Sequence, residues 1–180
     1  MKDKIACELE RSFAAYGFAE QGVDALRTRA DVSFRTLYKY FPSREAMIVG
    51  ALEYRHRRYF DWLAGGPQTG VEHILHPLVR LSDWLAEVAN TGCLFMNALA
   101  EYPDSEIIAA TVKSHKKMLA DEFKLRLEKV ASDRDTRLIA DTLFLLHEGM
   151  TQASRLQDRE KITQAALLAA RAALLAEKIE

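Results

Sequence analysis

The chain has 180 residues, of which 49% are hydrophobic and 28% charged, and its formal net charge is −1 at pH 7. This balance is typical of a folded globular protein and excludes an intrinsically disordered chain. No segment approaches the ~18 uncharged apolar residues that a membrane span requires, and the first residues show an amphipathic pattern instead of a secretory signal. The two cysteines, Cys7 and Cys93, are far apart and indicate no disulfide framework. We expect a cytoplasmic protein that does not associate with membranes.

Positive charge is concentrated near the N-terminus. Residues 1–60 contain 11 Lys and Arg against 8 Asp and Glu, a formal charge of +3, whereas residues 61–180 contain 14 against 18, a charge of −4. Between Ala25 and Arg44 there are five cations and one acid, Asp31, which gives a local charge of +4. These cations are Arg27, Arg29, Arg35, Lys39 and Arg44. A basic head on an acidic body favours contact with a phosphate backbone.

The same segment has the pattern of two short helices joined by a tight turn. Val23, Leu26 and Ala30 form an i, i+3, i+7 stripe, the buried face of the first helix. Asp31 follows, a residue that tolerates the left-handed conformation of a turn. Ser33 is a good N-cap for the second helix. The spacing therefore predicts a helix-turn-helix over about residues 22–41.

The next helix is expected to begin directly after this motif. Pro42 ends the preceding helix, Ser43 caps the new one, and the helical pattern continues to about Leu63. A three-helix packing unit with a solvated charged face would show the same pattern up to this point, since charge runs are commonly solvated surface. Both readings stay open on pattern alone.

This region resembles the N-terminal DNA-binding domain of the TetR family of transcriptional regulators. The resemblance is carried by Tyr16-Gly17-Phe18, by the helix and turn from Val23 to Val32, and by the run from Ser33 to Ala46, which includes TLYKYFPSREA. It implies that residues 1–46 form the DNA-binding domain and that residues 47–180 form a helical effector-binding and dimerisation domain. Asp31, where the family usually has Gly, and Gln21-Gly22, in place of a capping Thr/Ser pair, depart from its pattern.

The resemblance also implies which side chains contact DNA. By the resemblance, the residues that contact phosphates are Thr36, Tyr38, Tyr40 and Arg44. The residues that lie at or near base edges are Ser33, Phe34, Arg35 and Lys39. Arg35 falls in the first turn of the second helix, the part that reaches base edges in a major groove. Phe34 stands where the family often has a polar residue, which suggests an apolar contact such as one with a thymine methyl group.

The rest of the chain is predicted to be entirely helical, with about nine helices in total. After a break at residues 64–67, the first expected helix is Val71–Ala89, with a kink at Pro77. The second follows Gly92 and ends at Tyr102-Pro103, and the third runs from Asp104 to about Val130. The last two are expected over about Asp133–Leu156 and from Asp158 to the C-terminus. Ser132 and Asp135 are expected to form a capping box. No glycine-rich phosphate loop and no alternating strand pattern occurs in the sequence. The fold class is all-α.

The last two helices are apolar on most faces, so they must be covered on most faces. A second subunit is the natural cover, although one of them could instead be a central core helix. The resemblance implies a dimer in which these helices form a four-helix bundle with their counterparts. The residues predicted at the dimer interface are Leu143, Leu146, Met150, Leu167, Leu168, Leu174 and Leu175.

The sequence contains no convincing catalytic or metal site. His73 and His76 have an i, i+3 spacing but no third ligand at a convincing spacing. Cys93 has no basic cluster nearby, so a small buried apolar role is favoured over a redox role. Nothing combines a nucleophile, a base and an oxyanion donor. We expect no cofactor, no metal and no enzymatic activity.

A ligand pocket is predicted in the second domain, because mostly apolar walls with a few polar groups suit a small molecule. Its candidate residues are Trp62, Trp84, Phe95, Met96, Asn97, Tyr102, His115, Met118, Phe123 and His147. Each of them also fits an ordinary core position.

Taken together, the residues and the resemblance predict a homodimeric regulator, a repressor that binds a palindromic operator in double-stranded DNA and is released by a small apolar or amphipathic effector. Two alternatives remain: a helical bundle that binds a ligand or metal or acts as an enzyme, and a helical interaction module that does not touch DNA.

Overall fold

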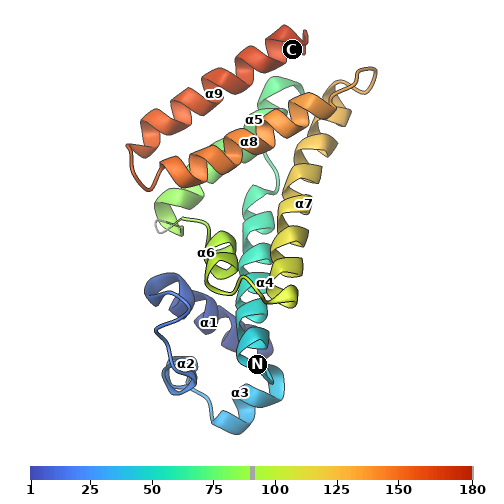
Figure 1. Ribbon diagram of the computed structural model, residues 1–180. Helices are drawn as coiled ribbons and strands as arrows, with labels where there is room; N and C mark the ends of the chain where they lie inside the picture. Colours follow the sequence, from blue (N-terminus) through green and yellow to red (C-terminus); the bar gives the residue numbers. More distant parts are fainter. Residues whose placement is uncertain (90–91, 180) are drawn as a thin grey trace. The chain divides into compact units, whose positions relative to one another are not determined.

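The computed structural model describes residues 1–89 and 92–179, which form nine α-helices and no strand (Figure 1). The predicted all-α class is therefore confirmed. The chain divides into two compact units, unit 1 with Met1–Phe60 and Cys93–His115, and unit 2 with Asp61–Gly92 and Lys116–Glu180. Within the described residues, none of the helices is long and apolar enough to cross a membrane.

Unit 1 is built on the N-terminal helices. Its elements are α1 (Lys2–Tyr16), α2 (Val23–Ala30), α3 (Phe34–Tyr40), most of α4 (Arg44–Leu63), α6 (Leu94–Glu101) and the first part of α7 (Glu106–Val130). One apolar cluster joins them, and Leu9, Phe13, Leu26, Leu37 and Ile48 are each at most 1% exposed in it. Burial of each such side chain contributes about 1.5–3 kcal/mol, so this core fixes the position of the short α2 and α3.

The turns around α3 form as their residues predict. Asp31 ends α2 in the left-handed conformation, with φ 53° and ψ 54°. The Ser33 hydroxyl accepts a hydrogen bond from the Thr36 amide at 3.1 Å, and the Ser43 hydroxyl accepts one from the Ala46 amide at 3.0 Å. The predicted N-caps of α3 and α4 are thus confirmed, and both helix starts are set by local chemistry.

Unit 2 contains the end of α4, α5 (Gly70–Glu87), the rest of α7, α8 (Arg137–Ala153) and α9 (Arg159–Ala176). In Figure 1, α8 and α9 lie side by side, and α5 packs against both. The predicted capping box at Ser132 and Asp135 is wrong. The Asp135 carboxylate instead accepts from the backbone amide and guanidinium of Arg137, and α8 begins only at Arg137.

The last helix is shorter than predicted. It ends at Ala176 because Lys178 adopts a left-handed conformation, with φ 57°. The Ile179 amide then donates to the Leu174 carbonyl at 2.9 Å, which closes the helix end with a backbone bond of the Schellman type.

Helix α5 continues through Pro77, although proline has no backbone N–H to donate to the carbonyl four residues earlier. That carbonyl belongs to His73, and the Arg126 guanidinium supplies the missing hydrogen bond at 2.9 Å. Arg126 also donates to the Leu63 carbonyl at the end of α4, at 3.2 Å, and pairs with Glu122 at 2.7 Å. This buried arginine therefore satisfies two backbone groups that helix geometry leaves without a partner.

We predict that Arg126→Met lowers the free energy of unfolding by about 2–4 kcal/mol, since it strands two buried carbonyls at about 1–3 kcal/mol each. In a Pro77→Ala background the cost should fall by about 1 kcal/mol, because alanine in place of the proline restores a helical N–H for the His73 carbonyl. Urea unfolding of the four proteins in this cycle measures the coupling. If the losses of unfolding free energy from the two substitutions are strictly additive, Arg126 does not replace the hydrogen bond that Pro77 cannot donate.

Candidate functional site

The outward face of α3 is a continuous polar and aromatic surface. Leu37 and Phe41, which are 0% and 2% exposed, anchor the helix in the core of unit 1. Phe34 and Tyr38 lie on the opposite side, 46% and 44% exposed, with their rings stacked at 6.5 Å. Ser33, Arg35 and Lys39 are also exposed, while Thr36 and Tyr40 are half-buried. Seven predicted contact residues therefore lie on or beside one short helix.

Arg35 and Lys39 are the cations that α3 presents to solvent. Arg35 makes no hydrogen bond or ion pair with any residue in the described part of the chain, so its five N–H donors point to solvent. The Lys39 ammonium lies 5.6 Å from the Tyr40 ring centroid. Both side chains can reach an external anion or a base edge without breaking an internal contact.

The other cations of the motif are used within the fold. Arg27 pairs with Asp24 at 2.9 Å and lies over the Phe34 ring. Arg29 donates to the Ser12 hydroxyl at 2.9 Å and lies over the Tyr16 ring at 4.0 Å. The local charge counted from Ala25 onwards therefore overstates the positive potential, because Asp24 lies just outside that range.

Arg44 has a different role from the predicted phosphate contact. Its Nε donates to the Tyr102 hydroxyl at 3.2 Å, and its two terminal nitrogens donate to the backbone carbonyls of Gln21 and Phe18. The guanidinium also lies 5.6 Å from the Phe13 ring centroid. With its donors directed into unit 1, Arg44 holds the turn between α1 and α2, and its contact with a phosphate stays a prediction.

Two more residues that sequence reasoning missed complete this turn. The Glu101 carboxylate at the end of α6 accepts hydrogen bonds from the Ala19 amide at 2.7 Å and the Phe18 amide at 3.4 Å. The buried Gln21 amide group donates to the carbonyls of Ser12 and Gly17 at 2.9 and 2.8 Å. Gln21 was noticed only as a departure from the family's cap, and Glu101 gave no local signal because it lies 82 residues from Ala19.

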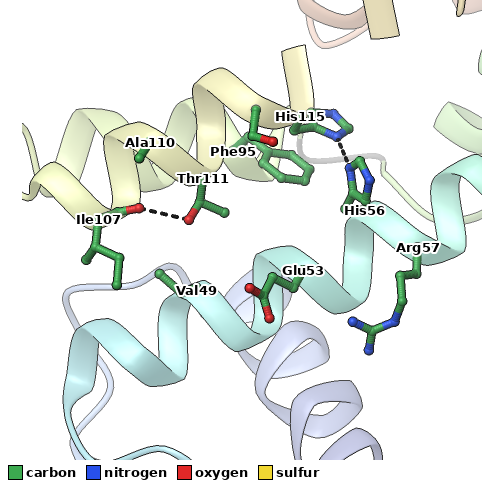
Figure 2. A pocket seen from close by; sticks show the side chains of 10 residues that line it. Val49, Glu53, His56, Arg57, Phe95, Ile107, Ala110, Thr111 and His115 are labelled. Carbon is green, nitrogen blue, oxygen red and sulfur yellow. Dashed lines mark hydrogen bonds between the residues drawn. The ribbon is translucent and has the colours of Figure 1, made fainter. Parts of the chain in front are cut away.

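A pocket of about 460 Å³ lies between α4, α6 and α7 within unit 1 (Figure 2). It is lined by Val49, Glu53, His56, Arg57, Phe95, Ile107, Ala110, Thr111, Ser114 and His115. Figure 2 shows His56 and His115 pointing toward each other from α4 and α7, with 3.0 Å between their Nδ1 atoms. The Phe95 ring stacks on His115 with a centroid distance of 3.7 Å and an interplanar angle of 2°.

The two histidines form a hydrogen-bonding pair in which the His56 ring is neutral. Burial lowers the pKa of His56, and the nearby Arg57 lowers it further, so the ring is uncharged at neutral pH. A direct Nδ1 to Nδ1 bond requires one ring to donate and the other to accept, which two imidazolium ions cannot do. The lining combines apolar side chains with this histidine pair, two hydroxyls and the charged Glu53 and Arg57, so it suits a small molecule that has both apolar and polar groups.

The predicted ligand residues are spread over both units. Phe95 and His115 line the pocket of unit 1, whereas Met96 and Met118 are exposed surface residues and Asn97 is half-buried outside its lining. Tyr102 binds Arg44. In unit 2, Trp62 packs on Trp84 at 5.6 Å, and Phe123 lies against the buried His147 at 6.3 Å. A role of these unit 2 residues in ligand binding stays a prediction, because aromatic content alone does not separate core from cavity.

The predicted dimer residues also divide. Leu143, Met150 and Leu174 are at most 1% exposed inside unit 2, so in the single chain they are core residues. Leu168 and Leu175 are 73% and 67% exposed, and Leu146 and Leu167 are half-buried. Sequence reasoning missed three leucines that are at least 67% exposed, namely Leu138, Leu145 and Leu156.

One histidine of α5, His73, has a structural partner. His73 Nδ1 lies 2.7 Å from the Pro67 carbonyl, which orients the ring toward the loop before α5. Across residues 1–89 and 92–179, no group of three or more His, Cys, Asp or Glu side chains is placed to hold a metal ion.

Comparison with known proteins agrees with this geometry. The profile of bacterial regulatory proteins of the tetR family matches residues 9–51, which include the whole of α2 and α3. The HTH-type transcriptional regulator YjdC of Escherichia coli (strain K12) is 25% identical over 152 residues, 82% of this chain and 80% of that protein. SCO4454, a TetR-family transcriptional regulator from Streptomyces coelicolor, has a similar fold, with a TM-score of 0.86 at 24% identity over 96% of this chain and 93% of the other.

A third relative was solved with DNA. The TetR family transcriptional regulator CifR, as a cysteine mutant complexed with 26 bp double-strand operator DNA, has a TM-score of 0.73 at 21% identity over 96% of each chain. The matched N-terminal segment, the exposed face of its second helix and the shared all-helical fold lead to one conclusion: this chain carries the N-terminal DNA-binding domain of the TetR family of bacterial transcriptional regulators.

Proposed function

We propose that this regulator is a cytoplasmic homodimeric repressor that binds a palindromic operator in double-stranded DNA and leaves it when a small molecule binds. The observation that carries the proposal is the outward face of α3, where Arg35 and Lys39 have no internal ion pair among the described residues. The complex of CifR with operator DNA supports the same use of the fold.

On this proposal α3 enters the major groove with its first turn toward the bases. Arg35 pairs with guanine O6 and N7, and the exposed Phe34 ring contacts a thymine methyl group. Ser33 and Lys39 lie at or near base edges. Thr36, Tyr38 and Tyr40 bind phosphates, which positions the helix without reading sequence.

The proposed dimer uses the exposed leucines of α8, of α9 and of the turn between them. Leu138, Leu145, Leu156, Leu168 and Leu175 are each 67–88% exposed in the single chain. Burying one such side chain contributes about 1.5–3 kcal/mol, so covering the set favours association strongly. A two-fold dimer presents two copies of α3, which is why the operator should be palindromic.

The pocket of unit 1 is the proposed effector site. Four of its lining residues, Val49, Glu53, His56 and Arg57, belong to α4, the helix that begins at Arg44 directly after the helix-turn-helix. A ligand that fits the pocket in only one position of α4 shifts the population toward that position. The two copies of α3 then lose their alignment with successive major grooves, and the operator is released.

We predict that Arg35→Ala weakens binding to the preferred operator by about 1–3 kcal/mol, the scale of one bidentate pair with guanine. The preferred site is obtained by selection from randomised DNA, and affinities are then measured over all its single-base variants. The loss should be confined to one G·C pair in each half-site, at symmetric positions.

Tyr38→Phe serves as the matched control for this experiment. It removes a hydroxyl proposed to bind phosphate, so it should weaken every variant by a similar factor and leave the preferred sequence unchanged. If Arg35→Ala behaves in the same uniform way, Arg35 binds the backbone and does not read sequence.

We predict that Leu168→Glu or Leu175→Glu converts the dimer into a folded monomer. Each residue is exposed in the single chain, so the subunit tolerates glutamate, whereas an unpaired charge buried at the interface costs several kcal/mol. Sedimentation at micromolar concentration should give twice 20.4 kDa for the wild type and 20.4 kDa for the variants.

Leu125→Glu, at a 61% exposed position on α7, is the control and should remain dimeric. A monomeric wild type, or a Leu168→Glu variant that stays dimeric, would rule out this interface.

A further inference from the structure

We propose that Glu101 is a positioning residue for DNA binding, and that α6 is a direct relay from the pocket to the helix-turn-helix. This inference rests on the proposed function, but it assigns the coupling to a contact that does not depend on a movement of α4. All the groups involved lie in unit 1.

The first step is a set of hydrogen bonds at the C-terminal end of α6, made by Glu101 and Tyr102 and called the clasp below. Glu101, the last residue of α6, accepts hydrogen bonds from the amides of Phe18 and Ala19. These amides lie in the turn that follows Gly17, the C-cap of α1, so they have no helical acceptor. The adjacent Tyr102 hydroxyl accepts from Arg44, which in turn donates to the Phe18 carbonyl. The end of α6 thus holds the turn in two ways: Glu101 binds two of its backbone amides directly, and Tyr102 binds one of its carbonyls through Arg44.

The second step is what that turn controls. It connects α1 to α2, and α2 packs on both α1 and α3. Both helices of the motif are short, with 8 and 7 residues, so their own hydrogen bonds hold them weakly. Their orientation depends on core packing and on this turn. Loss of the clasp therefore leaves α3 folded but less well oriented for a groove.

The third step is the opposite end of α6. Phe95 is its second residue, lines the pocket and stacks on His115. An α-helix of eight residues is a rod about 12 Å long. A ligand that displaces Phe95 or its partner His115 moves this rod, and Glu101 and Tyr102 move with it. The pocket and the turn are thereby linked through one short helix.

The sign of the charge makes the proposal testable. Glu101 is an exposed carboxylate in the unit that carries the DNA-binding surface, so by electrostatics alone its removal should strengthen DNA binding. A positioning role predicts the opposite, because the oriented α3 is lost. The two explanations therefore differ in direction and not merely in size.

The experiment compares Glu101→Ala and Glu101→Gln with Glu20→Ala, a neighbouring exposed glutamate for which the described residues provide no ion pair or hydrogen bond. Amide hydrogen exchange at Phe18 and Ala19 should accelerate about tenfold in Glu101→Ala, the scale expected for loss of a charge-assisted bond, and less in Glu101→Gln, which keeps an acceptor. Exchange at Leu9 and Phe13 in α1 should not change, which shows that the unit remains folded. Affinity for selected DNA should fall about fivefold or more in Glu101→Ala and stay equal or rise in Glu20→Ala.

The relay itself is tested by filling the pocket. Ala110→Trp places a large side chain against the pocket wall, and Lys113→Trp places the same side chain on an exposed position of α7 outside the lining. Ala110→Trp should accelerate exchange at Phe18 and Ala19 and should have no further effect in the Glu101→Ala background, whereas Lys113→Trp should leave both amides unchanged. A purely structural role of Glu101 gives additive effects of the two substitutions.

Unchanged exchange at Phe18 and Ala19 in Glu101→Ala, or additive effects with Ala110→Trp, overturns the proposal. The exchange measurements need neither DNA nor effector. If every variant and the wild type fail to bind DNA, the proposed function fails while the relay is still decided by the exchange data.

Discussion

The DNA-binding surface depends on a turn whose backbone groups are bound by residues from outside it. Between the end of α1 at Tyr16 and the start of α2 at Val23 the chain has no regular hydrogen bonding to hold it. Glu101 and Arg44 provide donors and acceptors from outside, and Gln21, within the turn, donates to the carbonyls of Ser12 and Gly17. Since α2 and α3 are too short to be stable alone, the orientation of α3 follows from this turn and from the apolar core beneath it.

This constraint explains how charge is used in the motif. A cation committed to an internal carbonyl or carboxylate fixes geometry, and a cation without such a partner can bind a ligand. Arg27, Arg29 and Arg44 are of the first kind, and Arg35 and Lys39 of the second. The exposed cations without an internal partner are consequently few and lie on one helix. The pocket lies in the same compact unit, and one of the helices that line it, α4, begins directly after the motif.

Sequence reasoning succeeded where the cause is local. The Ser33 and Ser43 caps and the left-handed Asp31 follow from the chemistry of a few adjacent residues. It did not reveal contacts with a distant cause, because Tyr102, a partner of Arg44, lies 58 residues away. It also did not reveal which side of α8 the core covers. A helix that is apolar all round gives no signal for this, and only the structure separates the buried Leu143 from the exposed Leu145.

The most direct test of the account is a hydroxyl-radical footprint of the purified protein on DNA selected from a random pool. The account predicts two protected patches of equal length, related by a two-fold axis and centred about one helical turn, or a multiple of it, apart. Protection should weaken steeply as salt rises, because phosphate contacts release counterions. A single patch, or uniform protection with no selected sequence, would contradict the claim that two copies of α3 read a palindrome.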